Sequence, residues 1–148
     1  MYFAAYSPTA LTLVSLYAGT PDEKTFPRAL EAAERLAADS TRRGALARWV
    51  TIVDPEAPPP SSAERKQMAL TNAKFGPLHV ALVTPSMVQR AVITAVHWLQ
   101  PLRPGQRYAA FGAVEEAIAW HEELARARLP VLRELVLQVQ ASTRGAAR

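Results

Sequence analysis

Two short segments rich in bulky and β-branched residues constrain this chain more than any other feature. They are residues 49–53, Trp-Val-Thr-Ile-Val, and residues 78–83, Leu-His-Val-Ala-Leu-Val. A proline follows each segment closely, which is typical of a buried strand that ends in a turn. A helical pattern then follows each one. Strands that alternate with helices predict parallel strands joined by right-handed crossovers, and therefore an α/β fold.

The rest of the chain extends this alternation. Residues 2–6 and 10–17 flank Ser7-Pro8-Thr9 and predict a hairpin, and residues 108–111 predict a further short strand. The predicted order is ββαβαβαβαα: a single-layer mixed, mostly parallel five-stranded sheet packed with helices, plus an extra C-terminal helix. We expect an α/β domain over residues 1–128, and an amphipathic helix with a basic, frayed tail over residues 129–148.

The composition excludes several classes of protein. The chain has 148 residues and no cysteine, which excludes a disulfide scaffold, a thiolate metal site and a cysteine nucleophile. The longest uncharged stretch, from Met1 to Asp22, carries no basic leader and alternates like strands. It predicts neither a signal peptide nor a membrane span. We therefore expect a cytoplasmic protein with no membrane partner.

The positive charge is confined to the end of the chain. Residues 126–148 hold five arginines against one glutamate, whereas residues 1–125 balance 12 basic against 12 acidic residues. Nucleic-acid-binding surfaces usually spread their cations over one face and interleave aromatic residues. The tail has no aromatic residue, so we interpret it as a basic helix end that complements the helix dipole. Nucleic acid is disfavoured as a partner.

The sequence shows no catalytic or cofactor-binding constellation. It contains no glycine-rich phosphate loop and no nucleophile elbow. The histidines fall on different predicted elements without metal-ligand spacing: His79, His97 and His121. The tryptophans are interpreted as core residues, the alternative being a ligand box: Trp49, Trp98 and Trp120. We expect a protein that is not an enzyme and that uses no cofactor or metal.

The apolar stripes of two predicted helices bear on what the protein binds. The stripe after Thr84-Pro85 is wide, so we expect it to be well buried; it consists of Val88, Ala91, Val92, Ala95, Val96 and Leu99. The stripe of the last helix is a candidate interaction surface, which consists of Leu132, Leu135, Val136 and Val139. This second stripe could dock on its own sheet, bind a partner, or pair two copies of the chain as a homodimer.

The segment from Asp54 to Ser62 joins a predicted strand to the start of a helix. Open α/β sheets bind ligands and partners at that edge. Ser61-Ser62-Ala63-Glu64 has the form of a capping box, so the serines are interpreted first as helix caps. A phosphate on Ser62 would also lie in the favourable field of the first helical turn. Asp54, Ser61 and Ser62 are therefore candidates for a partner-binding loop or a phospho-acceptor.

The chain resembles the STAS superfamily, in particular the bacterial anti-sigma-factor-antagonist-like proteins, over residues 1 to about 124. The resemblance rests on the order of elements and on residues 49–54, 78–84 and 107–120, of which the last, RYAAFGAVEEAIAW, is the most specific. It implies a STAS-like domain that acts as a switch or docking module. In such antagonists a partner kinase phosphorylates a serine at the start of the helix after the central strand. Ser61-Ser62 match that position, with Pro60 and Ala63 where the family's turn has an acidic residue and a glycine.

We therefore expect a non-enzymatic regulatory or scaffolding module that binds an unidentified protein partner. Two other hypotheses stay open. One is a domain that binds a small apolar ligand or lipid between sheet and helices. The other is nucleic-acid binding through the arginine-rich tail.

Overall fold

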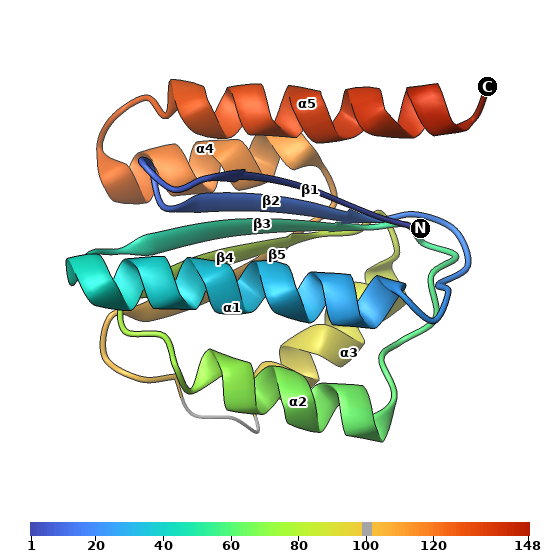
Figure 1. Ribbon diagram of the computed structural model, residues 1–148, viewed down its shortest axis with the longest axis horizontal. Coiled ribbons are helices and arrows are strands. Elements are labelled where there is room, and N and C mark those ends of the chain that lie inside the picture. Colours follow the sequence, from blue (N-terminus) through green and yellow to red (C-terminus); the bar gives the residue numbers. More distant parts are fainter. Residues whose placement is uncertain (99–101) are drawn as a thin grey trace.

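The centre of the protein is a five-stranded sheet, described here from a computed structural model (Figure 1). The structure describes the backbone of residues 1–98 and 102–148 and the side chains of residues 1–92 and 102–148. The strands lie in the order β1 (Tyr2–Ser7), β2 (Thr12–Tyr17), β3 (Ala47–Val53), β4 (Leu78–Val83) and β5 (Gln106–Phe111). β1 is antiparallel to β2, and the other neighbours are parallel. The predicted α/β fold with a mixed, mostly parallel five-stranded sheet is therefore confirmed.

The helices cover both faces of this sheet. α1 (Thr25–Arg43), α2 (Ser62–Asn72) and α3 (Met87–Trp98) connect successive parallel strands, and each connection advances by one strand in the same direction. Right-handed connections that advance the same way place their helices on one face. Figure 1 shows these three helices below the sheet, with α4 (Val114–Ala125) and α5 (Pro130–Ala146) above it. Among the described residues, no helix is both long and apolar enough to cross a membrane.

The middle strands contribute side chains to a hydrophobic core on each face of the sheet. Val14, Val50 and Ala81 lie side by side across β2, β3 and β4 and are buried under α4 and α5. The preceding residues of the same strands, Leu13, Trp49 and Val80, are buried on the opposite face with α1. Burial on both faces explains why residues 49–53 and 78–83 are continuously bulky rather than alternating with polar residues.

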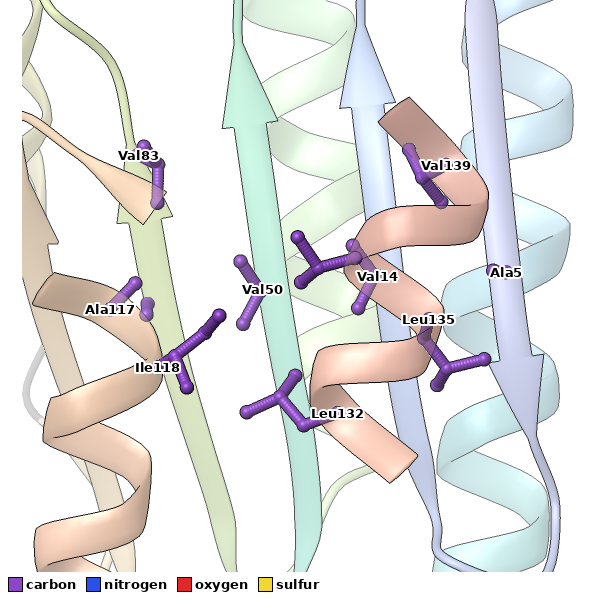
Figure 2. Close-up of a cluster of buried hydrophobic side chains, with 11 residues drawn as sticks. Ala5, Val14, Val50, Val83, Ala117, Ile118, Leu132, Leu135 and Val139 are labelled. Carbon is purple, nitrogen blue, oxygen red and sulfur yellow. The ribbon is translucent and has the colours of Figure 1, made fainter. Parts of the chain in front are cut away.

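α5 completes the layer above the sheet. Its stripe of Leu132, Leu135, Val136 and Val139 is at most 6% exposed and belongs to the cluster that contains Ala5 and Val14 (Figure 2). Docking on its own sheet is therefore the alternative that the structure adopts. The other two alternatives, in which these four residues bind a partner or pair two copies, do not agree with their burial. The reason is that α4 lies over β3, β4 and β5, so α5 is needed to cover β1 and β2.

The end of the chain is also more ordered than the sequence indicates. α5 continues to Ala146, so within residues 129–148 the predicted frayed tail is wrong for all but the last two residues of the chain. The Ser142 and Thr143 hydroxyls donate to the carbonyls of Gln138 (3.0 Å) and Gln140 (2.7 Å). These bonds keep both side chains within the last helical turns. Because α5 shares its core with the sheet, residues 129–146 belong to the same folded unit as residues 1–128.

Truncation of the α5 stripe should destabilise the whole fold. Leu132→Ala removes a side chain that is 1% exposed, and we expect it to lower the free energy of unfolding by about 3 kcal/mol. Leu137→Ala is a matched control on the same helix, where the leucine is 66% exposed and the loss should stay within about 0.5 kcal/mol. Denaturant unfolding measures both, and an equal loss in the two variants would contradict the packing described here.

Candidate interaction surface

The predicted partner-binding loop lies where β3 ends, at the carboxyl edge of the parallel strands. The Asp54 amide donates to the carbonyl of Tyr17 at 2.9 Å, which continues the pairing of β3 with β2. Asp54 then folds the loop back on itself: its carboxylate accepts from the amide of Glu56 at 3.1 Å, and its carbonyl accepts from the amide of Ala57 at 3.0 Å. The Asp54 side chain is therefore used to shape the turn.

The two serines of this loop have different roles. Ser61 is the N-cap of α2: its hydroxyl accepts from the Glu64 amide at 3.2 Å, and its own amide donates to the Glu64 carboxylate at 3.1 Å. The predicted capping box is thus confirmed. Ser62 is exposed, and its hydroxyl accepts from the guanidinium of Arg65 at 3.2 Å. Of the two candidate hydroxyls, the one at Ser62 faces solvent beside a cation.

Gln89 of α3 ties this loop to the neighbouring strand. Its amide nitrogen donates to the carbonyls of Pro55 (3.1 Å) and Ala57 (3.0 Å), and its amide oxygen accepts from the buried Thr84 hydroxyl at 2.7 Å. One side chain thus connects the loop after β3 with the turn after β4. Gln89 was not among the predicted site residues. The only sign of it in the sequence is that Gln89-Arg90 interrupts an otherwise apolar stretch.

Arg90 extends the same connection to β5. Its guanidinium donates to the Thr84 carbonyl at 2.6 Å and lies against Gly112, which follows β5. A Cβ on Gly112 would come within 3.1 Å of the guanidinium, so the absence of a side chain there permits the close approach. The loops that follow β3, β4 and β5 are therefore held together at one edge by two neighbouring residues of α3.

This attachment leaves the apolar side of the first turns of α3 exposed to solvent. Met87, Val88 and Val92 are 76%, 73% and 51% exposed, and Ala91 between them is exposed as well. These four positions lie on one face of a helix. The prediction that the α3 stripe is well buried is wrong for Val88, Ala91 and Val92, because the polar side chains next to them face the loops instead. The predicted stripe positions Ala95, Val96 and Leu99 lie outside the described side chains.

No metal-binding cluster occurs among the described residues, which include the side chains of His79 and His121. His121 is completely buried, and its Nε2 lies 3.3 Å from the carbonyl oxygen of Trp49, to which it donates. His79 is half-buried on β4, and its register partners on the neighbouring strands are Arg48 and Arg107. Burial, and then these two arginines, lower the pKa of His79. His97 lies outside the described side chains.

Trp49 and Trp120 lie on opposite faces of the sheet and do not form one ligand box. Trp49 is buried on the α1 face, where its indole N–H donates to the Ser15 hydroxyl at 2.9 Å. Trp120 lies on the opposite face, with its ring centroid 5.9 Å from Phe111 and 4.9 Å from His121. Trp98 lies outside the described side chains. The cavity between α1, α2 and the sheet, lined by Trp49, has a volume of only about 10 Å³ and so holds one water molecule at most.

Comparisons with protein-family models, with curated proteins and with solved structures gave no match to this chain. The features that bear on its function are therefore those of its own surface. These are the carboxyl edge of the sheet and the outward apolar face of α3.

Acid should destabilise the protein through His121. Burial lowers the pKa of His121 to about 4, against 6.5 for an unperturbed histidine. Between these values the unfolded chain binds a proton that the folded chain does not. The free energy of unfolding should therefore fall by about 3 kcal/mol in all as the pH drops from about 6.5 to about 4.

Denaturant unfolding across this pH range measures the effect of His121. His121→Gln keeps an N–H group for the Trp49 carbonyl but does not titrate, so it should flatten the dependence over this interval. The difference between the two curves isolates His121 from the carboxylates that titrate in both chains. The same pH dependence in both proteins would show that His121 does not carry the effect.

Proposed function

We propose that this protein is a non-enzymatic interaction module, with a regulatory or scaffolding role, that binds a protein partner through α3 and the adjoining loop. The observation that carries the proposal is the outward apolar face of Met87, Val88, Ala91 and Val92. Contiguous apolar side chains on a surface mark interaction sites more often than chance exposure does. Met87 also brings a flexible, polarisable side chain that adapts to a partner.

The surroundings of this face fit the anatomy of a protein–protein interface. Such interfaces have an apolar centre and a polar rim. Here the rim is supplied by the loop after β3, which carries the exposed acidic residue Glu56 and the exposed Ser61 and Ser62. Gln89 fixes the backbone of that loop against α3. A surface held in place before binding loses less conformational entropy when the partner docks.

The STAS-like character belongs to the same proposal. Its support is the stretch at residues 107–120, which supplies β5 and the first half of α4, together with the order of the elements. In a module of this type the serine-bearing loop after the central strand is the place of regulation. Ser62 is the better acceptor here, because the Ser61 hydroxyl is engaged in the capping box.

Phosphorylation of Ser62 would act on the proposed interface by charge. A phosphoserine carries about two negative charges and accepts strong hydrogen bonds. At Ser62 it would lie at the N-terminus of α2 and beside Arg65, both of which favour an anion. The end of the loop that Gln89 holds at Pro55 and Ala57 would thus gain negative charge while the apolar face of α3 stays unchanged, which is a means of selecting between partners.

Charges placed on α3 should abolish partner binding. The variant is the double substitution Val88→Asp, Val92→Asp, which places charges in the apolar centre of the interface. We expect it to capture at least about tenfold less partner than the unmodified protein, as measured by affinity capture and quantitative mass spectrometry. Leu137→Asp on α5 is the matched control, since it places a charge on a similarly exposed apolar residue. Thermal unfolding should show that both variants fold. Partners that are kept equally by both variants would overturn the proposal.

A change at Ser62 should alter the set of partners. Ser62→Glu imitates the added charge, and Ser62→Ala removes the hydroxyl without adding charge. We expect the glutamate variant to gain or lose a partner relative to the alanine variant and the unmodified protein. Leu137→Glu, at an exposed position of α5 outside both proposed surfaces, is the control for charge alone. Identical partner sets for all four proteins would exclude regulation at Ser62 and would leave the α3 interface standing.

A further inference from the structure

The outer edge of β1 has backbone groups free to pair with another strand. β1 is the first strand of the sheet order, and among the described residues only β2 pairs with it. Met1 and Ala18 exchange backbone bonds of 2.9 and 2.7 Å. Because bonded and non-bonded pairs alternate in an antiparallel ladder, Tyr2, Ala4 and Tyr6 direct their N–H and C=O groups away from β2.

This edge also lacks the usual protection against pairing. Natural edge strands carry charged residues, proline or a bulge that blocks a second strand. β1 reads Tyr-Phe-Ala-Ala-Tyr-Ser, without a charge or proline, and Ala4 at its centre is exposed. β5, the strand at the opposite edge, carries the exposed cation Arg107. Of the two edge strands, β1 therefore has fewer features that block a further strand.

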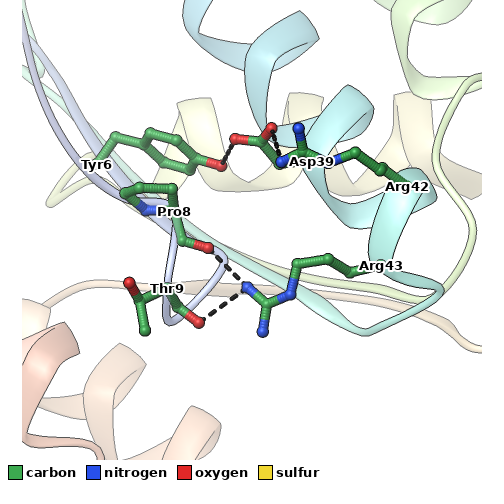
Figure 3. Close-up of polar contacts among 6 residues, drawn as sticks. All are labelled: Tyr6, Pro8, Thr9, Asp39, Arg42 and Arg43. Atoms are coloured by element: carbon green, nitrogen blue, oxygen red, sulfur yellow. Dashed lines mark hydrogen bonds and ion pairs between the residues drawn. The ribbon is translucent and has the colours of Figure 1, made fainter.

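The hairpin that bears this edge is fixed by α1 (Figure 3). The Tyr6 hydroxyl donates to the Asp39 carboxylate at 2.6 Å. The Arg35 guanidinium lies 4.9 Å from the centre of the Tyr6 ring. Arg43 donates to the carbonyls of Pro8 (2.7 Å) and Thr9 (2.9 Å) in the turn of the hairpin. An edge held in this way needs little ordering before it pairs.

We propose that the partner of this edge is a second copy of the chain, which pairs β1 with β1 in antiparallel orientation around a two-fold axis at Ala4. The three outward residues are symmetric about Ala4. Tyr2 then exchanges backbone bonds with Tyr6 of the second copy, and Ala4 with Ala4 of the second copy. The two five-stranded sheets join into one continuous sheet, through an interface in which the same patch serves both subunits.

The helix α5 has the spacing that such a dimer needs. α5 contacts β1 and β2, whereas α1 contacts β3 as well as these two strands. With strands about 4.8 Å apart, a helix centred between β1 and β2 lies about 5 Å from the two-fold axis. α5 and its copy would then be about 10 Å apart, which is the packing distance of two helices. On this face the joined sheet is therefore covered by helices in contact.

The charged residues of α1 are placed so that two copies can form ion pairs across this two-fold axis. α1 runs parallel to β1, and its Arg35 and Asp39 lie next to Tyr6. The stretch of strand from Tyr6 back to Ala4 is about 7 Å long, and about four residues of α-helix cover the same length. The two-fold axis therefore crosses α1 at the level of Ala33. Glu31 of each copy then faces Arg35 of the other copy, which gives two equivalent ion pairs. Both residues are exposed and available for these ion pairs.

The flank of α5 that faces the second copy is mostly uncharged. Arg133 of α5 binds Glu122 of α4 at 2.8 Å, so that side of the helix faces α4. Helical spacing places Val131, Glu134, Gln138 and Ser142 toward the opposite side, above the β1 edge. Glu134 is the charged residue among these four, and it is exposed.

Light scattering after size-exclusion chromatography of the full chain, over a range of concentrations, tests this proposal. We expect a mass of twice 16.2 kDa at high concentration. Ala4→Pro removes the outward N–H but no bond to β2, and should raise the dimer dissociation constant at least about tenfold. The double variant Val88→Asp, Val92→Asp is the control and should keep the wild-type mass, so failure here is separate from failure of the α3 interface.

A charge exchange tests the orientation without touching the strand. Glu31→Arg should weaken the dimer, because the introduced guanidinium would face the like charge of Arg35 in the second copy. The double variant Glu31→Arg, Arg35→Glu should restore it. Three results would each overturn the proposal: a monomer at every concentration, a folded Ala4→Pro variant that dimerises like the wild type, or a double variant that stays as weak as Glu31→Arg. A dimer lost in the α3 control would also overturn it.

Discussion

Burial of the middle strands on both faces is the constraint on which the rest of this structure depends. Neighbouring residues of β2 and β3, such as Leu13 and Val14 or Trp49 and Val50, point into different cores, and all four are buried. Each face therefore needs its own cover of helices. The three crossover helices all fall on one face because every crossover advances the same way. The chain must then return across the other face, and α4 and α5 do so.

The junction between α4 and α5 is held by Glu122. Its carboxylate accepts hydrogen bonds from the Leu129 amide and from the Arg133 guanidinium, both at 2.8 Å. The hydrogen bond from Arg133 is the main cause that lowers the pKa of this carboxyl group to about 2.

The cover that α1 already gives to the sheet explains why the apolar side of α3 is exposed. The face of the sheet below β2 and β3 is covered by α1, and α2 packs on α1. α3 contacts β5 at the margin of the sheet and is held at its N-terminal end by polar bonds rather than by apolar burial. Gln89 and Arg90 bind backbone carbonyls and thus occupy the inner side of the helix. The apolar side is left outside, which is where a partner can reach it.

Whether the sequence predicts a feature depends on how far apart in the chain the residues that determine it lie. The strands at residues 49–53 and 78–83 and the capping box of Ser61 and Glu64 depend on residues close together in the chain, and they were predicted. The orientation of α3 depends on Gln89 meeting Pro55 and Ala57, more than 30 residues away. Periodicity shows that a helix has an apolar side, but it does not show what that side faces. For the same reason the stripe of α5 left three alternatives open until β1 and β2 were seen to need a cover.

The two proposed surfaces lie at opposite ends of the sheet, and this bears on the kind of function that they allow together. β1 is one edge strand, and α3 contacts β5, the other edge strand. Pairing two copies through β1 therefore leaves both α3 faces uncovered and places them at the far ends of the joined sheet. A dimer of this form offers two equal sites to a partner, and a partner that is itself dimeric or repetitive would bind with an avidity that neither site provides alone. A monomer with one such site is an adaptor, whereas a dimer with two sites connects its partners, and that distinction makes the β1 edge relevant to a scaffolding role.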